Sequence, residues 1–194
     1  DSQGFVGNFQ TNVQTPDGPK TITHGATLIA TGGRATETEE YLYRHNPRVS
    51  KWHELDAKPE QVRQARSIAF IQCVGSRDAE RPYCSHICCT TSISQAIAIK
   101  EQDPDTNVSI IYRDIRTPGR KEVLYKKARE LGVLFLRYSL DRKPRVQETE
   151  DGLEITVFDP ILQQEVSIGV DLLNLATAIE SNPIQDLTSI LKLP

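Results

Sequence analysis

Between residues 67 and 138 of this 194-residue chain, short apolar runs alternate with helical segments, and few folds accept that order. Three continuous apolar runs of strand length occupy 67–74, 107–112 and 133–138. A strand that is apolar on both faces suits a sheet that is covered on both sides. Helices are expected between these runs, over 84–101 and 121–131, and Gly132 is a natural C-terminal cap for the second. This order predicts an α/β fold built on a Rossmann-like parallel sheet.

Weaker patterns flank these runs. The pair Asp151-Gly152 predicts a tight turn, and so a β-hairpin or meander added to the sheet. The first 20 residues are polar, with a Pro-Asp-Gly turn at 16–18. The other expected elements are a strand over 21–30, a short helix over 37–45, a helix after Pro59, hairpin strands over 145–149 and 153–158, a further strand over 165–168 and a buried strand over 170–176.

All four cysteines of the chain lie between Cys73 and Cys89, in the pattern C-x10-C-x3-C-C. Cys73 comes at the end of an expected strand, whereas Cys84, Cys88 and Cys89 lie at a loop and helix start. On one helix, Cys84 and Cys88 would be one turn apart and share a face. The loop 75–83 can fold Cys73 back over that face. Four thiolates that converge on one point suit an iron–sulfur cluster or tetrahedral zinc.

The surroundings of the cysteines favour an anionic, electron-accepting cluster. A helix N-terminus offers unpaired N–H groups and a partial positive charge. Arg77, Arg81 and His86 add positive charge nearby. The adjacent Cys88 and Cys89 fit zinc-ribbon spacing poorly, because those sites use paired Cys-x2–4-Cys knuckles. A disulfide or redox dithiol and a set of inert buried thiols stay open as alternatives.

A second candidate site follows the strand expected over 21–30. That strand ends in Ala30-Thr31-Gly32-Gly33, where glycine lets the backbone approach a bound nucleotide closely. A plain strand and turn explains the same residues. The chain contains no G-x-G-x-x-G, which is the stronger dinucleotide signature.

Composition excludes several classes of protein. The formal net charge of −3 argues against broad nucleic-acid binding. No apolar run approaches the roughly 18 residues of a membrane-spanning helix. The basic residues from Arg113 to Arg129 are typical of a solvated helical face, with a docking surface for an acidic partner as the alternative. Met is absent, including at position 1, so we expect an internal fragment of a larger protein.

Several segments together resemble the A subunit of heterodisulfide reductase. They also resemble similar flavin and iron–sulfur oxidoreductases, among them subunits of quinone-interacting membrane-bound oxidoreductases. The segments that carry the resemblance are 4–9, 31–33, 70–77, 83–89, 111–117 and 124–133. The cysteine region, with FIQCVGSR followed by YCSHICC, is the most specific part. The resemblance extends over nearly the whole chain.

The resemblance implies a thioredoxin-reductase-like core, of the pyridine-nucleotide-disulfide oxidoreductase type, that binds FAD and exchanges electrons with iron–sulfur clusters. It implies a [4Fe–4S] cluster held by Cys73, Cys84, Cys88 and Cys89. It also implies that Ala30, Thr31 and Gly32 lie against FAD. No catalytic residue is assigned in this chain.

The same resemblance suggests how the chain is divided. Residues 1–66 and 169–194 would be partial segments of the FAD domain. Residues 67–168 would be a Rossmann-like insert, similar to an NAD domain, that carries the four-cysteine motif. Because this motif takes the place of the nucleotide-binding glycines, we do not expect direct NAD binding.

The leading hypothesis is a fragment of an electron-transfer oxidoreductase subunit that passes electrons between FAD and iron–sulfur clusters. Its partners would be other subunits of a heterodisulfide-reductase-like or membrane-associated redox complex in the cytoplasm, with no nucleic acid and no direct membrane span. The fragment alone would be inactive and would not hold FAD, because the N-terminal flavin loop of the family is missing. The rival hypotheses are a thiol/disulfide oxidoreductase that uses a cysteine pair and a structural zinc-binding interaction module.

Overall fold

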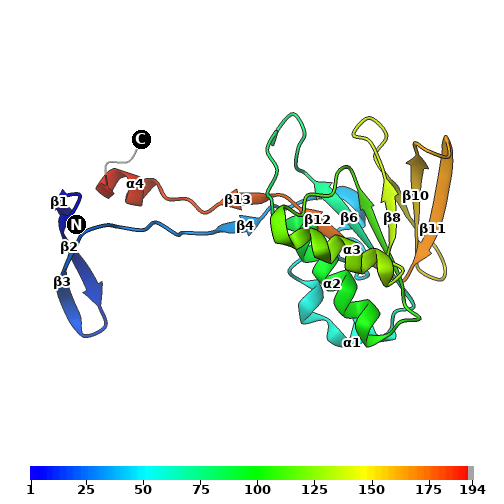
Figure 1. The fold of residues 1–194 in the computed structure, drawn as a ribbon, viewed down its shortest axis with the longest axis horizontal. Coiled ribbons are helices and arrows are strands. Elements are labelled where there is room, and N and C mark those ends of the chain that lie inside the picture. The colour runs from blue at the N-terminus through cyan, green and yellow to red at the C-terminus, as the bar shows by residue number, and fades with distance from the viewer. Residues whose placement is uncertain (192–194) are drawn as a thin grey trace. The chain divides into compact units, whose positions relative to one another are not determined.

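The computed structural model describes residues 1–191, which divide into two units (Figure 1). The smaller unit contains residues 1–34 and the segment from Glu180 onward, and the larger unit is formed by residues 35–179. Both hydrophobic core clusters belong entirely to the larger unit. The larger unit also carries all four cysteines.

A five-stranded parallel sheet in the order β5-β12-β6-β7-β8 forms the centre of the larger unit. Its strands are β5 (Val49–Lys51), β6 (Ser67–Val74), β7 (Asn107–Tyr112), β8 (Leu134–Arg137) and β12 (Leu172–Thr177). The apolar runs expected as strands form β6, β7 and β8, so the predicted α/β fold with a parallel sheet is confirmed. From β6 the chain builds β7 and β8 on one side and later returns to place β12 on the other.

The two faces of this sheet are covered differently (Figure 1). On one face, Ile93 and Ile97 of α2 (Cys88–Gln102) share a core cluster with Phe70 of β6. The helices α1 (Pro59–Gln64) and α3 (Glu122–Glu130) complete this cluster. The other face packs against an antiparallel meander through a second cluster that includes Ile71 and Ile155. The meander strands are β9 (Arg145–Glu148), β10 (Leu153–Asp159) and β11 (Gln164–Val170). The strands on both sides of Asp151-Gly152 pair as expected.

The smaller unit is mostly polar. An antiparallel sheet joins β1 (Ser2–Phe5), β2 (Asn8–Thr15) and β3 (Gly18–His24), and β4 (Gly33–Ala35) pairs with β13 (Ile179–Ser181) at the boundary with the larger unit. The helix α4 (Gln185–Leu191) follows. The single strand predicted over 21–30 is wrong. The chain leaves β3 after His24, and Leu28 is 92% exposed.

Residues 37–45 do not form the short helix that was predicted. A three-residue 3₁₀ turn, η1 (Glu40–Leu42), replaces it. Tyr41, Leu42 and Arg44 have positive φ, and such backbone cannot continue a right-handed helix. The short strand β5 and the 3₁₀ turn η2 (Leu55–Ala57) lie in the polar stretch before α1, where no strand was expected. The helix predicted after Pro59 is confirmed as α1.

By its contacts, the chain divides into two units at 34/35 and 179/180. The expected domain boundaries at 66/67 and 168/169 stay a prediction. The strands β5 and β12 lie outside 67–168 and pair with each other, and β12 also pairs with β6. In the described residues 1–191, no helix is long and apolar enough to cross a membrane.

Candidate functional site

The cysteines gather at the carboxyl end of the parallel sheet, around its topological switch point. Chain connections leave β6 in one direction toward β7 and return on its other side at β12. In open α/β sheets the crevice beside such a point is where ligands bind. Cys73 lies at the end of β6, and Cys88 and Cys89 form the first turn of α2.

Cys73 occupies an irregularity in the sheet. Between Leu175 and Thr177 the register of β12 against β6 shifts, because Leu175 pairs with Ile71 while Thr177 pairs with Val74. The extra residue on β6 is accommodated where Cys73 takes a left-handed φ of 61°. A bulge of this kind bends a strand and redirects a side chain, and bulges are frequent next to functional sites.

Cys84 is not on the helix, which corrects the prediction that it shares a helix face with Cys88. The helix α2 begins at Cys88, because His86 has a φ of 62° and interrupts right-handed backbone. The preceding loop is closed by Ser76, whose Oγ donates to Tyr83 O at 2.9 Å. Ile179 N donates to Ser85 Oγ at 3.0 Å. These bonds bring Cys84 back to the sheet edge from a loop.

The four thiols influence one another. Burial is the main reason why the pKa of Cys88 rises to about 12, and negative charge on Cys89, Cys73 and Cys84 would raise it further. Burial likewise raises the pKa values of Cys73 and Cys89. Charge on Cys84 adds to both shifts, and charge on Cys73 adds to that of Cys89. The other three cysteines are therefore near enough to affect the ionisation of Cys88.

Each buried thiol of α2 has a carbonyl partner on a different strand end. Cys88 Sγ donates to Thr177 O and Cys89 Sγ to Asp114 O, both at 3.7 Å. Thr177 ends β12, and Asp114 follows β7. The first turn of α2 is thus held over β6 and its two neighbours in the sheet.

Positive charge does lie beside the cysteines, as expected for Arg77. Its Nη1 is 3.9 Å from Cys73 Sγ, and its Nη2 donates to Asp114 Oδ2 at 2.5 Å. The hydrogen bond from Arg77, together with its charge, holds the pKa of Asp114 below its ordinary value. The backbone N of His86 donates to Cys84 Sγ at 3.4 Å. Asp114 was missed in the sequence, because a single acidic residue after a strand carries no spacing signal.

A layer of buried polar groups close to the site was also missed. Gln72, Ser92, Asn174 and Thr177 are fully buried, and their side-chain polar atoms have no hydrogen-bond partner among the described residues. Gln72 directly precedes Cys73 in β6. Unpaired buried polar atoms are rare in native folds, so this layer marks the sheet edge as specialised.

The donor set fits a tetrathiolate centre in its chemistry. All four thiols are free of disulfides, and each is buried or half-buried. As the side chains stand, no three of the His, Cys, Asp and Glu groups in residues 1–191 form a set that could hold a metal ion. Closing the site around a cluster therefore requires thiol movement, and Cys84, in its loop, is the thiol outside regular structure.

The candidate flavin residues Ala30, Thr31 and Gly32 lie in the smaller unit and are exposed. Gly32 has a φ of 69°, a conformation that favours glycine. Asn182 holds this stretch, since its Nδ2 donates to Thr31 O at 2.8 Å. The role of these three residues stays a prediction.

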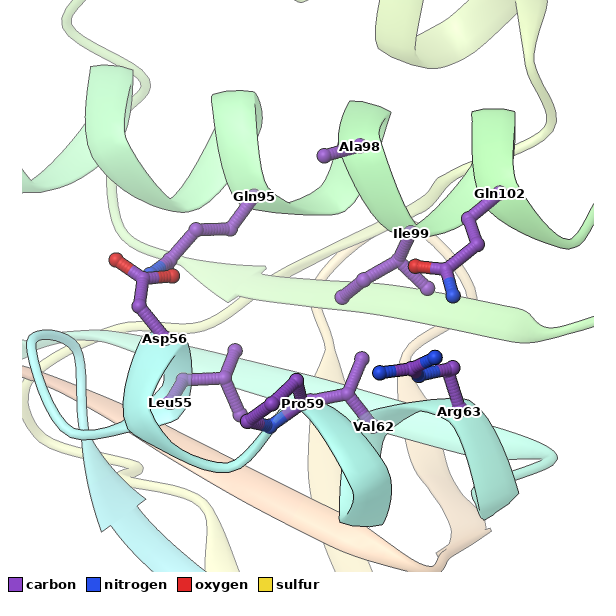
Figure 2. A pocket seen from close by; sticks show the side chains of 9 residues that line it. All are labelled: Leu55, Asp56, Pro59, Val62, Arg63, Gln95, Ala98, Ile99 and Gln102. Carbon is purple, nitrogen blue, oxygen red and sulfur yellow. The ribbon is translucent and has the colours of Figure 1, made fainter.

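A separate cleft of 320 Å³ lies between α2 and the segment containing η2 and α1 (Figure 2). Its walls are largely apolar, with Leu55 and Val62 facing Ile99 of α2. Gln95 at one end donates through Nε2 to Asp56 Oδ1 at 2.9 Å. No lining residue is a cysteine, so this cleft is distinct from the candidate site.

Comparison with curated proteins finds several relatives named after the A subunit of heterodisulfide reductase. The chain is 33% identical over 173 residues to a protein of Archaeoglobus profundus that is named as similar to the A subunit of heterodisulfide reductase, a match that covers 85% of this chain and 24% of that protein. It is also 38% identical over 137 residues to the iron-sulfur A subunit of the CoB–CoM heterodisulfide reductase of Methanocaldococcus jannaschii. This match covers 68% of this chain and 20% of that protein. No family model matches the chain.

Solved structures support the fold alone. The L-lysine 6-monooxygenase of Pseudomonas syringae aligns with 99% of this chain and 54% of its own, with a TM-score of 0.54 at 13% identity. The cadaverine monooxygenase of Erwinia amylovora, solved with FAD, aligns with 95% of this chain and 52% of its own, with a TM-score of 0.53 at 10% identity.

The curated relatives are about four to five times longer than the region they share with this chain. Their shared region includes most of the larger unit's sequence, and several of them match at comparable identity. Over this shared region, the chain belongs to the family formed by the A subunits of heterodisulfide reductases and the proteins similar to them.

Proposed function

We propose that this chain is part of an electron-transfer oxidoreductase subunit in which Cys73, Cys84, Cys88 and Cys89 hold a [4Fe–4S] cluster. The cluster would exchange electrons with FAD, against which Ala30, Thr31 and Gly32 would lie. The other subunits of a heterodisulfide-reductase-type complex would be its partners. One relative is itself named an iron-sulfur subunit, which is consistent with the proposal.

The gathering of the four cysteines at one sheet edge is the observation that carries this proposal. They come from a strand end, a loop and a helix start, yet charge on Cys73, Cys84 and Cys89 would raise the pKa of Cys88. Thiolates are the ligands that iron–sulfur clusters require. Bound there, such a cluster would supply one-electron chemistry, while the chain supplies burial, orientation and charge.

The residues around the thiols have roles of their own. Arg77 places a cation against Cys73, which favours added negative charge at the centre. The first turn of α2 contributes the N-terminal end of the helix dipole beside Cys88 and Cys89. Burial of the thiols limits access of water and raises the electrostatic effect of each nearby charge.

Three of the four thiols do not match the dithiol rival. A nucleophilic thiol needs a lowered pKa, whereas burial raises the pKa values of Cys73, Cys88 and Cys89. The structural-zinc rival uses the same four ligands, so the metal content decides between it and the cluster.

The test is to measure iron, acid-labile sulfide and zinc per chain after anaerobic reconstitution. We expect about four iron and four sulfide per chain. Each of the variants Cys73→Ser, Cys84→Ser, Cys88→Ser and Cys89→Ser should lose most of both. Ser94→Ala, on the exposed side of α2, serves as the control and should retain them.

The other outcomes identify the rivals. Zinc bound at one per chain with no sulfide would establish the structural module. A chain that binds no metal and carries a thiol that alkylates rapidly at neutral pH would support the dithiol oxidoreductase.

A further inference from the structure

A second cavity, of 430 Å³, opens at the same end of the sheet but contains no cysteine. Three arginines from three successive strand ends line it: Arg77 follows β6, Arg113 follows β7 and Arg137 ends β8. Asp114 is the one acidic residue among its lining residues. The cavity wall therefore carries an excess of two positive charges.

Internal hydrogen bonds hold the arginines in place and leave some of their guanidinium N–H groups free to bind a ligand. Arg113 donates through Nη1 to Arg77 O at 2.9 Å, and Arg137 donates through Nε to Arg113 O at 3.2 Å. Arg137 Nη2 is 3.8 Å from Asp114 Oδ1, which is beyond hydrogen-bond distance. Each guanidinium has five N–H donors, so most donors of Arg113 and Arg137 are unused by these bonds.

The position and the positive charge of the cavity both suit an anion. Ligands of open α/β sheets bind outside the carboxyl ends of the strands, where these three arginines lie. A planar guanidinium matches the oxygens of a phosphoryl group or a carboxylate with two parallel hydrogen bonds. Arg77 already donates through Nη2 to Asp114 Oδ2 and faces Cys73 Sγ with Nη1, so Arg113 and Arg137 are the groups available to a ligand.

Apolar side chains also line the cavity. Leu140 and Pro160 line it, together with Tyr138, whose hydroxyl donates away to Gln72 O at 2.6 Å. Leu140 is 40% exposed although it is apolar. A volume of 430 Å³ exceeds what a free inorganic anion fills, since cavities of this order accommodate small organic ligands.

From this arrangement we infer that the cavity binds an organic phosphate, meaning a phosphate ester with a small apolar or planar body. Arg113 and Arg137 bind the phosphoryl oxygens, and Leu140 and Pro160 contact the organic part. Phosphate is favoured over carboxylate because two guanidiniums and an excess of two charges match a dianion. The inference does not depend on a cluster, because the cavity contains none of the four cysteines.

The test uses isothermal titration calorimetry on the purified 194-residue chain, without reconstitution. The probes are phenyl phosphate, inorganic phosphate and benzoate. We expect binding of phenyl phosphate, weaker binding of inorganic phosphate and the weakest binding of benzoate. Arg137→Gln should weaken phenyl phosphate binding by about tenfold or more, because it removes charge-assisted hydrogen bonds. Arg137 is exposed, so this variant retains the fold, as circular dichroism would verify.

Matched variants locate the site. Arg63→Gln removes a guanidinium of the exposed face of α1, away from this cavity, and should leave affinity unchanged. Leu140→Asn should reduce phenyl phosphate binding toward that of inorganic phosphate. The inference is overturned by no binding of phenyl phosphate, by equal affinity for benzoate, or by an equal loss in Arg63→Gln and Arg137→Gln. Since metal content plays no part in the assay, these outcomes are independent of the cluster proposal.

Discussion

Around the cysteines, three non-glycine residues hold left-handed backbone: Cys73, Arg77 and His86. Each such residue costs of the order of 1–2 kcal/mol relative to right-handed or extended backbone. The loop retains this conformation because its own hydrogen bonds fix it, including the bond from Arg77 N to Tyr83 O at 3.2 Å. Strain concentrated in one loop, at a site with four thiols, is typical of functional segments.

Arg77 lets the electrostatics of the site be tested at one residue. Its guanidinium lies between the Cys73 thiol and the Asp114 carboxylate. If the cysteines hold a cluster, Arg77→Gln should lower its midpoint potential, because a cation near the centre favours the added electron. Arg77→Lys keeps the charge and should retain most of the potential. Redox titration of both variants measures this, and an unchanged potential in Arg77→Gln would contradict the role given to Arg77.

Glu54 provides a prediction on stability and pH. Burial alone would raise its pKa, but the Lys51 N–H, the Tyr43 hydroxyl and the Lys51 charge together lower it below 4.5. Its two carboxylate oxygens accept from Tyr43 Oη and Lys51 N, both at 2.7 Å. A lowered pKa in the folded state stabilises the fold above the unfolded-state pKa, and this contribution disappears as the pH falls through the folded-state pKa.

Glu54→Gln should therefore reduce the free energy of unfolding at pH 7 by about 1 kcal/mol or more. Below about pH 5 the wild-type value should fall toward that of the variant. Urea denaturation between about pH 3 and 7 measures both. Glu60→Gln, whose exposed pair with Arg63 contributes little, is the control. Parallel curves for wild type and Glu54→Gln would refute the assignment.

At the scale of elements, Gly152 sets how closely the β9–β10 turn approaches β11. A Cβ at this buried position would lie 2.7 Å from Val170 O, and a backbone atom of a strand cannot easily move. We expect Gly152→Ala to reduce the free energy of unfolding by about 1–3 kcal/mol, as overpacking does. Gly169→Ala in β11 meets open space and should be neutral or stabilising. Chemical denaturation of both variants gives the comparison, and equal stabilities would contradict it.

The elements that the sequence predicts well are those with an apolar pattern of their own. The strands β6 and β7 match their apolar runs, and α3 ends at Glu130, two residues before Gly132, which has a φ of 83°. The start of α2 was placed too early, because nothing in residues 84–87 forbids a helix. The break there depends on His86 and on the distant Ile179 N that binds Ser85. The sheet β1–β3 gives little apolar alternation to read, since its sequence is mostly polar.

The candidate site was likewise predictable only where its residues carry a pattern of their own in the sequence. Residue type and proximity in sequence single out the four cysteines and Arg77. Asp114, which follows β7, and Thr177, which ends β12, are distant in sequence, and no local pattern connects them to the cysteines. Their place at the site follows from the sheet order, which brings β7 and β12 to the two sides of β6.

At the scale of the whole chain, the larger unit is closed by strands that are distant in sequence. The strand β12 lies between β5 and β6 and contributes the buried side chains Leu173 and Leu175. Asp171 Oδ2, just before β12, accepts from Arg66 N at 2.7 Å and Ser67 N at 2.9 Å, where β6 begins. The insert expected over 67–168 contains neither β5 nor β12. One edge of β6 would then be unpaired and its apolar faces partly uncovered.

Two shortened chains test whether the larger unit needs β5 and β12 in order to fold. Residues 35–179 contain both core clusters, so we expect them to unfold in one cooperative thermal transition and to bind iron and sulfide as the 194-residue chain does. Residues 67–168 lack the central strand beside β6, so we expect no cooperative transition and a tendency to aggregate through the unpaired edge. Calorimetry and circular dichroism measure both. If 67–168 folds cooperatively, β12 is dispensable to the sheet. If residues 35–179 do not fold, the two core clusters are insufficient, and residues outside 35–179 are needed to stabilise the larger unit.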